Sequence, residues 1–255
     1  MKSTRLAILL LFILTVAITS CSDDNSPGGS SNNNGGGANN GGCAGGPTTV
    51  TDIDGNVYNV VSIGNQCWMK ENLKTTRYKN GNPIPSGLSD AQWQADTSGA
   101  YSVYKDSAQN DSVYGKLYNW YAVADTNGLC PTGWHAPEDW EWNVLVKAID
   151  PNADTICNGC IQSLIVGGAM KEIGLTHWAS PNTGATNSSG FTGLPGGFRY
   201  LDGIYYYVGL TGYWWSATQY STPKAYYRYL NYNGSFVSRG NDDKTVGFSV
   251  RCVRD

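Results

Sequence analysis

Histidines and carboxylates are the side chains that most often carry catalysis, and this chain of 255 residues has only two histidines. A metal centre or a histidine-activated nucleophile would depend on His135 or His177, or on carboxylates alone. The motifs G-x-S-x-G, H-E-x-x-H and the Walker loop are absent. The acids that a glycosidase pair would need are scattered: Glu71, Asp139, Glu141 and Asp202. We therefore expect a protein that is not an enzyme, with no catalytic residue, cofactor or metal, and interpret His135 as a structural hydrogen-bonding residue.

Seven cysteines supply the remaining reactive side chains. One of them, Cys21, directly follows a predicted export leader. Six cysteines remain, and an even number in an exported chain favours disulfides. The C-x-x-C around Asn158-Gly159 lacks the setting of a redox motif or a zinc knuckle, so a local disulfide is expected there. Spacing alone leaves fifteen pairings open. The pairs that we favour are Cys157–Cys160, Cys130–Cys252 and, by elimination, Cys43–Cys67.

Aromatic residues gather in the C-terminal half of the chain, in the runs 205–207, 214–215 and 226–229. Alternate side chains of an extended strand point to opposite faces, so one face can enter the core while the other stays outside. Exposed Tyr and Trp rings beside Arg, Asn and Asp are typical of a sugar-stacking surface. The residues that we predict to contact a ligand are Tyr205, Tyr207, Trp215, Tyr227, Arg228 and Tyr229. For any single aromatic residue, ordinary core packing is the alternative.

The first residues show the pattern of a bacterial lipoprotein leader. Lys2 and Arg5 precede an apolar run over Leu6–Ile18, which is too short to span a membrane as a helix. The run ends in Ile18-Thr19-Ser20-Cys21, which resembles a bacterial lipobox, in which the cysteine is acylated and becomes the first residue of the mature chain. We therefore expect a signal peptide over residues 1–20 and lipidation of Cys21, with palmitate among the acyl chains that hold the protein at a membrane. A plain signal peptide is the alternative.

Residues 21–47 form a predicted tether between the lipidated cysteine and the folded domain. Ser22, Asp23 and Asp24 resemble the acidic export tag of some Gram-negative surface lipoproteins. This resemblance favours a lipid anchor in the cell outer membrane, with the domain exposed on the cell surface. Asn25–Gly42 is nearly all Gly, Asn and Ser, a composition that cannot bury a core. As a flexible coil, the tether would span roughly 25–30 Å.

The charge balance argues against nucleic acid as a partner. Lys and Arg total 17, and Asp and Glu total 20. The predicted leader holds two basic residues and no acidic one, so its removal changes the net charge from −3 to −5. A negative surface repels anionic polymers. The expected partners are the membrane, through the N-terminal lipid, and a glycan or another cell-surface ligand.

The elements that must position these residues are predicted within 48–255. Val50–Ile63 alternates around Asp54-Gly55-Asn56 and predicts a hairpin, with a tight turn favoured over a calcium loop because the bidentate Glu is missing. Apolar spacing predicts helices over 115–124 and 137–149, and a weaker one over 163–173. Strands are predicted over 213–217, 225–232, 235–238 and 246–253, with a two-residue turn at 233–234. Helices mainly precede strands, so the predicted fold class is α+β, a single domain of two or three helices packed on short antiparallel strands.

Six sequence blocks carry a resemblance to a known family. They are IGNQCWMKENL (63–73), YGKLYNWYA (114–122), CPTGWHAP (130–137), FTGLPGGFR (191–199), YWWSAT (213–218) and VRCVRD (250–255). In this order they resemble the Fibrobacter succinogenes major paralogous domain over Thr49–Asp255. The resemblance implies a secreted or lipid-anchored module with a C-type lectin-like fold, akin to formylglycine-generating enzymes, and it implies no particular reaction. Glu138 departs from the pattern, in which Ser or Thr commonly caps the helix.

Three functions are compatible with these features. The first is a surface-anchored, non-enzymatic binding module for glycans or other cell-surface ligands. The second is a structural or adhesive envelope protein without a small-molecule ligand, and the third is an enzyme acting on extracellular polysaccharide or protein. The anchor, the tether, the lectin-like resemblance and the aromatic runs favour the first.

Overall fold

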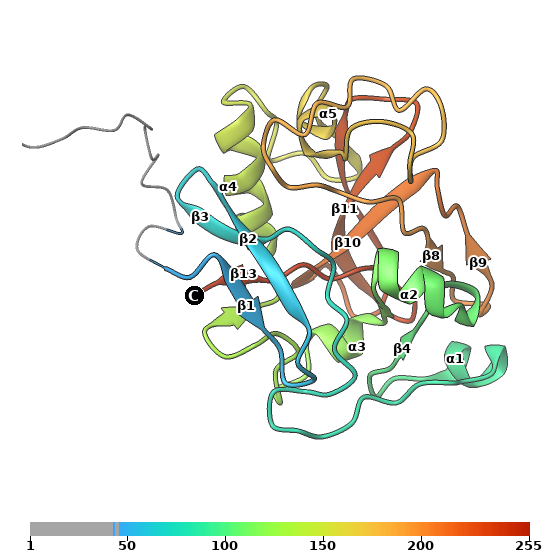
Figure 1. Cartoon of the computed structure of the whole chain (residues 1–255). Helices are drawn as coiled ribbons and strands as arrows, with labels where there is room; N and C mark the ends of the chain where they lie inside the picture. Colours follow the sequence, from blue (N-terminus) through green and yellow to red (C-terminus); the bar gives the residue numbers. More distant parts are fainter. Residues whose placement is uncertain (1–42, 44–45) are drawn as a thin grey trace, which may run out of the picture. The chain divides into compact units, whose positions relative to one another are not determined.

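Two antiparallel β-sheets form the frame of the molecule in the computed structural model, which describes Cys43 and residues 46–255 (Figure 1). The first sheet consists, in spatial order, of β1 (Thr49–Thr51), β2 (Val57–Ile63), β3 (Gln66–Met69), β13 (Val253–Arg254) and β6 (Trp134–His135). The second consists of β10 (Thr211–Gln219), β11 (Lys224–Asn231), β12 (Val237–Asp243) and β7 (Cys160–Ser163). Two further pairs join β4 (Tyr101–Ser102) to β5 (Leu117–Tyr118) and β8 (Phe198–Arg199) to β9 (Tyr205–Tyr206).

Short helices cover these sheets. They are α1 (Asp90–Ala95), α2 (Ala108–Tyr114), α3 (Trp120–Val123), α4 (Asp139–Ile149) and α5 (Val166–Met170), with a 3-10 turn η1 (Tyr104–Asp106). Within the described residues, no helix is both long and apolar enough to cross a membrane. These sheets and helices confirm the predicted single domain of mixed helices and antiparallel strands. Helices α1 and α2 were not predicted. The predicted leader, Cys21 and the tether up to residue 42 lie outside the described residues.

The predicted hairpin around residues 54–56 is present, with Thr51 of β1 opposite Val57 of β2. Its turn is held by Asp52, whose Oδ1 accepts the backbone N–H groups of Asp54 and Asn56, both at 2.9 Å. The Asp54 carboxylate accepts a hydrogen bond from Nε of Arg77 at 2.6 Å. Both carboxylates are therefore engaged by protein donors, as a tight turn requires.

Helix α4 follows from its apolar spacing, because Trp142, Leu145 and Val146 face one side and are fully buried. The Glu141 carboxylate accepts the backbone N–H of Glu138 at 2.8 Å, so an acid from the first turn caps this helix despite the missing Ser or Thr. The Trp142 ring lies 4.8 Å from Trp68 of β3, centroid to centroid. The same core cluster contains residues of β10, β11 and β12, so α4 joins the two sheets.

Four predicted elements are corrected. The stripe over 115–124 is not one helix, because Leu117 pairs with Ser102 in a strand and the Asn119 side chain caps the short helix α3 by accepting N–H of Ala122. The helix expected over 163–173 is limited to α5, since Ser163 pairs with Val237 in the second sheet and Lys171 forms a bridge with Gly193. The two-residue turn predicted at 233–234 is a longer loop that includes residues 235–236, because β11 ends at Asn231 and β12 begins at Val237. Within 246–253, residues 247–249 form only isolated bridges and Val253 lies in β13.

Three disulfides stabilise the described chain: Cys43–Cys67, Cys130–Cys252 and Cys157–Cys160. These are the pairs favoured from the sequence. Cys67 precedes Trp68 in β3 and Cys252 precedes Val253 of β13, and these two strands are neighbours. Two of the three bonds therefore tie distant segments to the middle of the first sheet.

Candidate ligand-binding surface

Tyrosines from neighbouring strands of the second sheet share one face. Tyr227 and Tyr229 of β11 point to the same side, and Tyr213 of β10 lies beside them, with ring centroids 5.5 and 4.9 Å away. Tyr213 is stacked on the buried Phe248 at 4.8 Å, which fixes its ring. Gly240 of β12 makes room for Tyr227, since a Cβ at that glycine would lie 2.5 Å from the Tyr227 ring.

The β8–β9 hairpin extends this face. Phe198 lies 5.2 Å from Tyr213 and 5.8 Å from Tyr207, measured between ring centroids. Tyr207 follows β9 in a left-handed conformation with φ of 61° and is 53% exposed. We call Tyr207, Tyr213, Tyr227 and Tyr229 the tyrosine surface. Tyr213, which the sequence analysis did not select, lies in a predicted strand two residues before Trp215, and this spacing places both on one face.

Burial keeps two hydroxyl groups of the tyrosine surface, those of Tyr213 and Tyr227, in the neutral form by raising their pKa. Burial raises the pKa of Tyr227 to about 12, with a further contribution from the negative charge of Asp242. Burial also raises the pKa of Tyr213. The Tyr229 hydroxyl accepts a hydrogen bond from the Asn231 amide. The face therefore offers half-buried rings whose polar ends can donate and accept hydrogen bonds.

Two predicted ligand contacts are corrected, because Trp215 and Arg228 are both 0% exposed. Trp215 shares the tyrosine face but is covered by Phe248, whose ring centroid lies 4.4 Å away, and its Nε1–H donates to the Tyr118 carbonyl. Arg228 points to the opposite face, as alternation along β11 requires. Tyr205 points away from the tyrosine surface, and its hydroxyl lies 3.4 Å from Oδ1 of Asp106.

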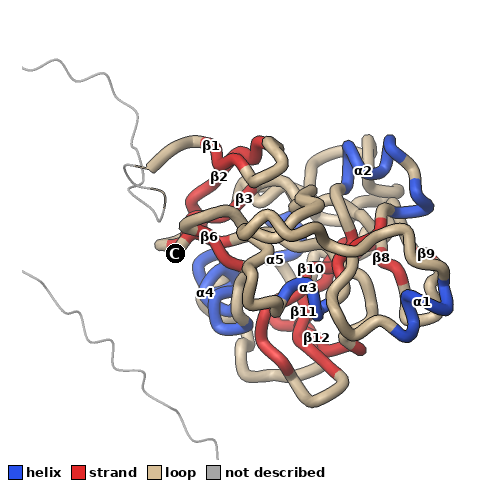
Figure 2. The backbone as a smooth tube through the Cα atoms, turned by 90° about the horizontal axis from the view of Figure 1, so that it is seen from below, coloured by secondary structure: helices blue, strands red, loops and turns tan. Residues whose placement is uncertain are grey.

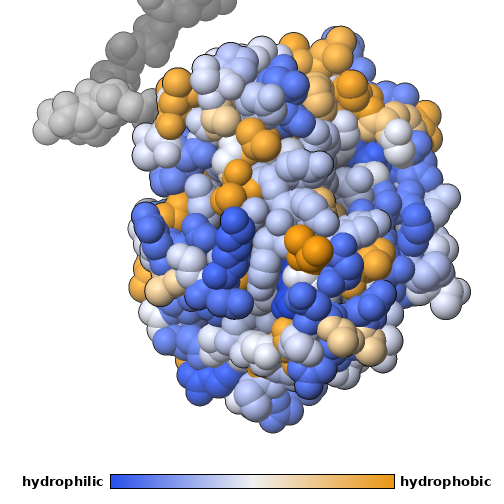
Figure 3. Space-filling model, turned by 90° about the vertical axis from the view of Figure 1, so that its right-hand side faces the viewer, coloured by the Kyte–Doolittle hydropathy of each residue, from blue (hydrophilic) through white to orange (hydrophobic). Residues whose placement is uncertain are grey.

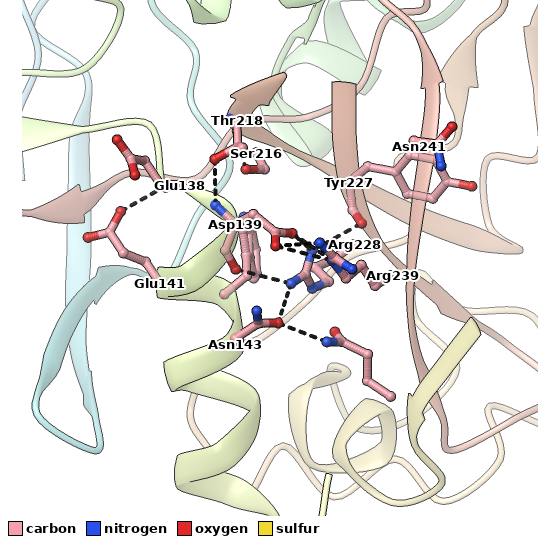
Figure 4. Close-up of polar contacts among 12 residues, drawn as sticks. Glu138, Asp139, Glu141, Asn143, Ser216, Thr218, Tyr227, Arg228, Arg239 and Asn241 are labelled. Atoms are coloured by element: carbon pink, nitrogen blue, oxygen red, sulfur yellow. Dashed lines mark hydrogen bonds and ion pairs between the residues drawn. The ribbon is translucent and has the colours of Figure 1, made fainter. Parts of the chain in front are cut away.

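Arg228 belongs to a buried ion cluster under α4 (Figure 4). Its Nη1 donates to Oδ1 of Asp139 at 2.8 Å, and Nη2 of Arg239 donates to Oδ2 of the same carboxylate at 2.8 Å. Asn143 accepts a further bond from Arg228 at 2.7 Å. Burial opposes the charge on Asp139, but hydrogen bonds and attraction from both guanidinium groups lower its pKa overall. The cluster clamps the first turn of α4 to β11 and β12, so we assign it a structural role.

His135 also has a structural setting. Its Nδ1 lies 2.6 Å from Oδ1 of Asp255, and its Nε2 lies 2.9 Å from Oε1 of Glu141. Hydrogen bonding to Glu141 raises the pKa of His135 to about 9, opposed by partial burial and supported by Asp255. The imidazole is therefore protonated at neutral pH and cannot act as a general base. His177 contacts the Glu172 carboxylate at 2.8 Å instead.

The described residues contain no group of three or more His, Cys, Asp or Glu side chains that could hold a metal ion. The six cysteines of this part of the chain are all paired, so none is a thiol nucleophile. Glu71, one of the scattered acids, accepts the backbone N–H of Asn59 at 2.8 Å. The tyrosine surface can therefore bind a ligand by itself, whereas a reaction there would need further groups.

Comparison with known proteins identifies the family. The model of the Fibrobacter succinogenes major domain matches residues 61–254. No curated protein matches the chain, and no solved structure does. Because the family model covers most of the chain, the protein belongs to the family of the Fibrobacter succinogenes major domain.

Proposed function

We propose that this protein is a lipid-anchored module of the bacterial outer membrane that binds glycans on the cell surface without catalysing a reaction. The tyrosine surface is the observation that carries the proposal. Rings with apolar faces and hydroxyl tips suit sugars, which present C–H groups on one side and hydroxyls at their edges. The C-type lectin-like resemblance of the sequence blocks supports the same function.

The placement of the surface is consistent with this function. The described chain enters at β1, and the β8–β9 hairpin lies at the other end of the molecule in both views (Figures 1 and 2). Figure 3 shows that end as a mainly polar face with apolar residues gathered along its upper edge. A ligand at this end would approach from the side away from β1.

A glycan array probed with the full chain, purified in detergent, tests the binding function. Tyr207→Asn removes the most exposed ring and keeps a residue that tolerates positive φ. We expect retention of the bound glycan to fall about tenfold, equivalent to ~1.4 kcal/mol. Tyr220→Asn is the matched control, because Tyr220 is also exposed but lies outside the tyrosine surface. Absence of any retained glycan, or equal losses in both variants, would refute the proposal.

The anchor is tested separately by feeding labelled palmitate to cells that produce the parent or Cys21→Ser. The parent is expected to incorporate label and to accumulate in the outer membrane, whereas the variant is expected to do neither. Equal labelling of the two proteins would contradict lipidation at this cysteine. Protease treatment of intact cells then reports whether the domain is exposed on the surface.

An adhesive envelope protein without a small-molecule ligand is the second candidate. Exposed aliphatic side chains around α5 favour it: Ile161, Leu164, Ile165, Ile173 and Leu175. Capture of an envelope protein together with a negative glycan array would support this alternative. An enzyme acting on extracellular polysaccharide or protein has no comparable support among the described residues.

A further inference from the structure

A carboxylate lies on the same face of the second sheet as the tyrosine surface. The strand register pairs Tyr227 of β11 with Gly240 of β12. It also pairs Ala225 with Asp242, two residues away along each strand. Directly opposite residues of antiparallel strands point to the same face, and so do residues two apart in one strand. Asp242 therefore shares the face of Tyr227, whereas its neighbour Asp243 points to the other face.

The Tyr227 side chain extends across β12 toward this carboxylate. A Cβ at Gly240 would lie 2.5 Å from the Tyr227 hydroxyl oxygen, so the tip of the ring lies directly above this glycine. Asp242 is the next residue of β12 on that face. The electrostatics agree with this geometry, because burial raises the pKa of both Tyr227 and Tyr213, and the negative charge of Asp242 is among the further causes for both.

The protein satisfies the Asp242 carboxylate only in part. Its Oδ1 accepts the backbone N–H of Asp243 at 2.8 Å, whereas its Oδ2 accepts no hydrogen bond from the described residues and is accessible to solvent. None of the ion pairs within the described residues includes Asp242. Burial raises the pKa of Asp242, opposed by the bond from Asp243 and by attraction to Lys224 and supported by the Asp243 charge. A cationic ligand would relieve this half-buried charge.

The rings beside this carboxylate hold no cation of the protein. Among the described residues, no cation–π contact includes a ring of the tyrosine surface. Arg228 and Arg239 of the same two strands point to the opposite face, where both bind Asp139. Lys224 at the start of β11 is exposed, and its register partner is Asp243. A cationic ligand would therefore not compete with a protein cation for these rings.

A carboxylate next to aromatic rings selects for an ammonium group. The face of an aromatic ring attracts a cation electrostatically. A hydrogen bond between an ammonium group and a carboxylate is roughly twice as strong as one between neutral groups. A ligand carboxylate would instead lie beside Asp242 without compensation, which is unfavourable. The negative net charge of the chain acts in the same direction.

We propose that the tyrosine surface binds glycans that carry a protonated amino sugar, with the sugar ammonium group hydrogen-bonded to Asp242 and the sugar C–H groups against the neighbouring tyrosine rings. This inference rests on the proposed glycan-binding function and names its ligand class. The rings contact sugars of any kind, whereas Asp242 selects those with a free amine. A cationic peptide offers the same ammonium group but lacks the C–H face and the hydroxyls of a sugar ring.

Titration calorimetry on the full chain in detergent tests this selectivity at mildly acidic pH. The probes are the trimer of glucosamine and the matching trimer of N-acetylglucosamine, which differ in the acetyl groups that remove the positive charge. We expect the glucosamine trimer to bind with Kd on the order of 0.1–1 mM and the acetylated trimer to bind about tenfold more weakly. Added NaCl should reduce this difference, because salt screens a partly exposed ion pair.

Asp242→Asn removes the charge but keeps an Oδ1 acceptor for the backbone N–H of Asp243. We expect the preference for the amine to disappear, with an unchanged Kd for the acetylated trimer. Tm should stay equal or rise, because a half-buried charge without an ion-pair partner has been lost. Asp243→Asn is the matched control, since it removes the same charge from the next residue, whose side chain points to the other face. The control should change the preference by less than about twofold.

Several results would overturn the inference. Equal binding of the two trimers by the parent would do so, as would a preference that persists in Asp242→Asn or a lower Tm of that variant with unchanged preference. Tighter binding of trilysine than of the glucosamine trimer, with the same dependence on Asp242, would assign the site to cationic peptides instead. Absence of binding by both trimers up to about 10 mM would also reject it.

The inference and the proposed function can fail separately. Tyr207→Asn should weaken both trimers by a similar factor, because this ring does not distinguish the amine from its acetylated form. If Tyr207→Asn weakens both trimers and Asp242→Asn affects neither, glycan binding by the tyrosine surface stands and selection of the amine does not.

Discussion

At the scale of single residues, Asp139 is a shared counter-ion, because its one carboxylate forms ion pairs with the guanidinium groups of both Arg228 and Arg239. Arg228 is completely buried and would lose its counter-ion in Asp139→Asn. We expect the free energy of unfolding to fall by about 3–5 kcal/mol, measured by urea denaturation. Asp90→Asn is the matched control, since Asp90 also binds an arginine but its side chain is 67% exposed, and its loss should cost at most about 1 kcal/mol. Similar losses in the two variants would contradict the argument.

His135 gives the fold a pH dependence at the same scale. An unfolded histidine has a pKa near 6.5, whereas the folded His135 has a pKa of about 9, mainly through Glu141. Because the folded pKa is the higher one, this stabilisation is fully present below about pH 6.5 and is lost as the pH rises to about 9. The excess Tm of the parent over His135→Gln should therefore shrink across that window. Partial exposure of the imidazole keeps the effect modest, and an excess that is constant with pH would refute it.

At the scale of elements, Lys171 holds the end of α5 to the loop at Thr183 and to the end of β11 with the loop that follows it. Its Nζ donates to the carbonyl oxygens of Thr183, Asn231 and Gly234, each at 2.9 Å, although burial lowers the pKa of Lys171 to about 8. Lys171→Met fills the space but leaves three carbonyls without this donor, so we expect a loss of about 3 kcal/mol in unfolding free energy. Lys147→Met on the exposed face of α4 should change it by less than about 0.5 kcal/mol. Equal losses in unfolding free energy for Lys171→Met and Lys147→Met would show that the buried ammonium group does not hold these segments together.

At the scale of the whole molecule, the disulfides restrain the unfolded chain to different degrees. Cys130 and Cys252 are 122 residues apart, whereas Cys157 and Cys160 are separated by three. Loop entropy predicts a loss of about 4.9 kcal/mol on removing the long-range bond and about 1.9 kcal/mol on removing the short one. Urea denaturation of two double Cys→Ala variants, one for each disulfide, checks this order. Equal losses in unfolding free energy for the local and the distant pair would contradict it.

The outcome for individual elements shows how far local information reaches. The β1–β2 hairpin and α4 were predicted because their determinants lie within a few residues: a turn held by Asp52, and apolar side chains at helical spacing. The helix expected over 115–124 was wrong because Leu117 pairs with Ser102, fifteen residues earlier along the chain. A strand pair that distant leaves no trace in local periodicity, so tertiary pairing overrode the helical pattern.

The sequence by itself determined the family, the α+β class, the parity of the cysteines and the runs from which the tyrosine surface is built, since all of these depend on composition or on short spacings. Only the tertiary structure decided which rings remain accessible. Trp215 is buried because Phe248 folds over it, and Arg228 because α4 supplies Asp139 beneath the sheet. Whether a side chain is exposed depends on segments that are far apart in the chain and pack against it only in the folded state.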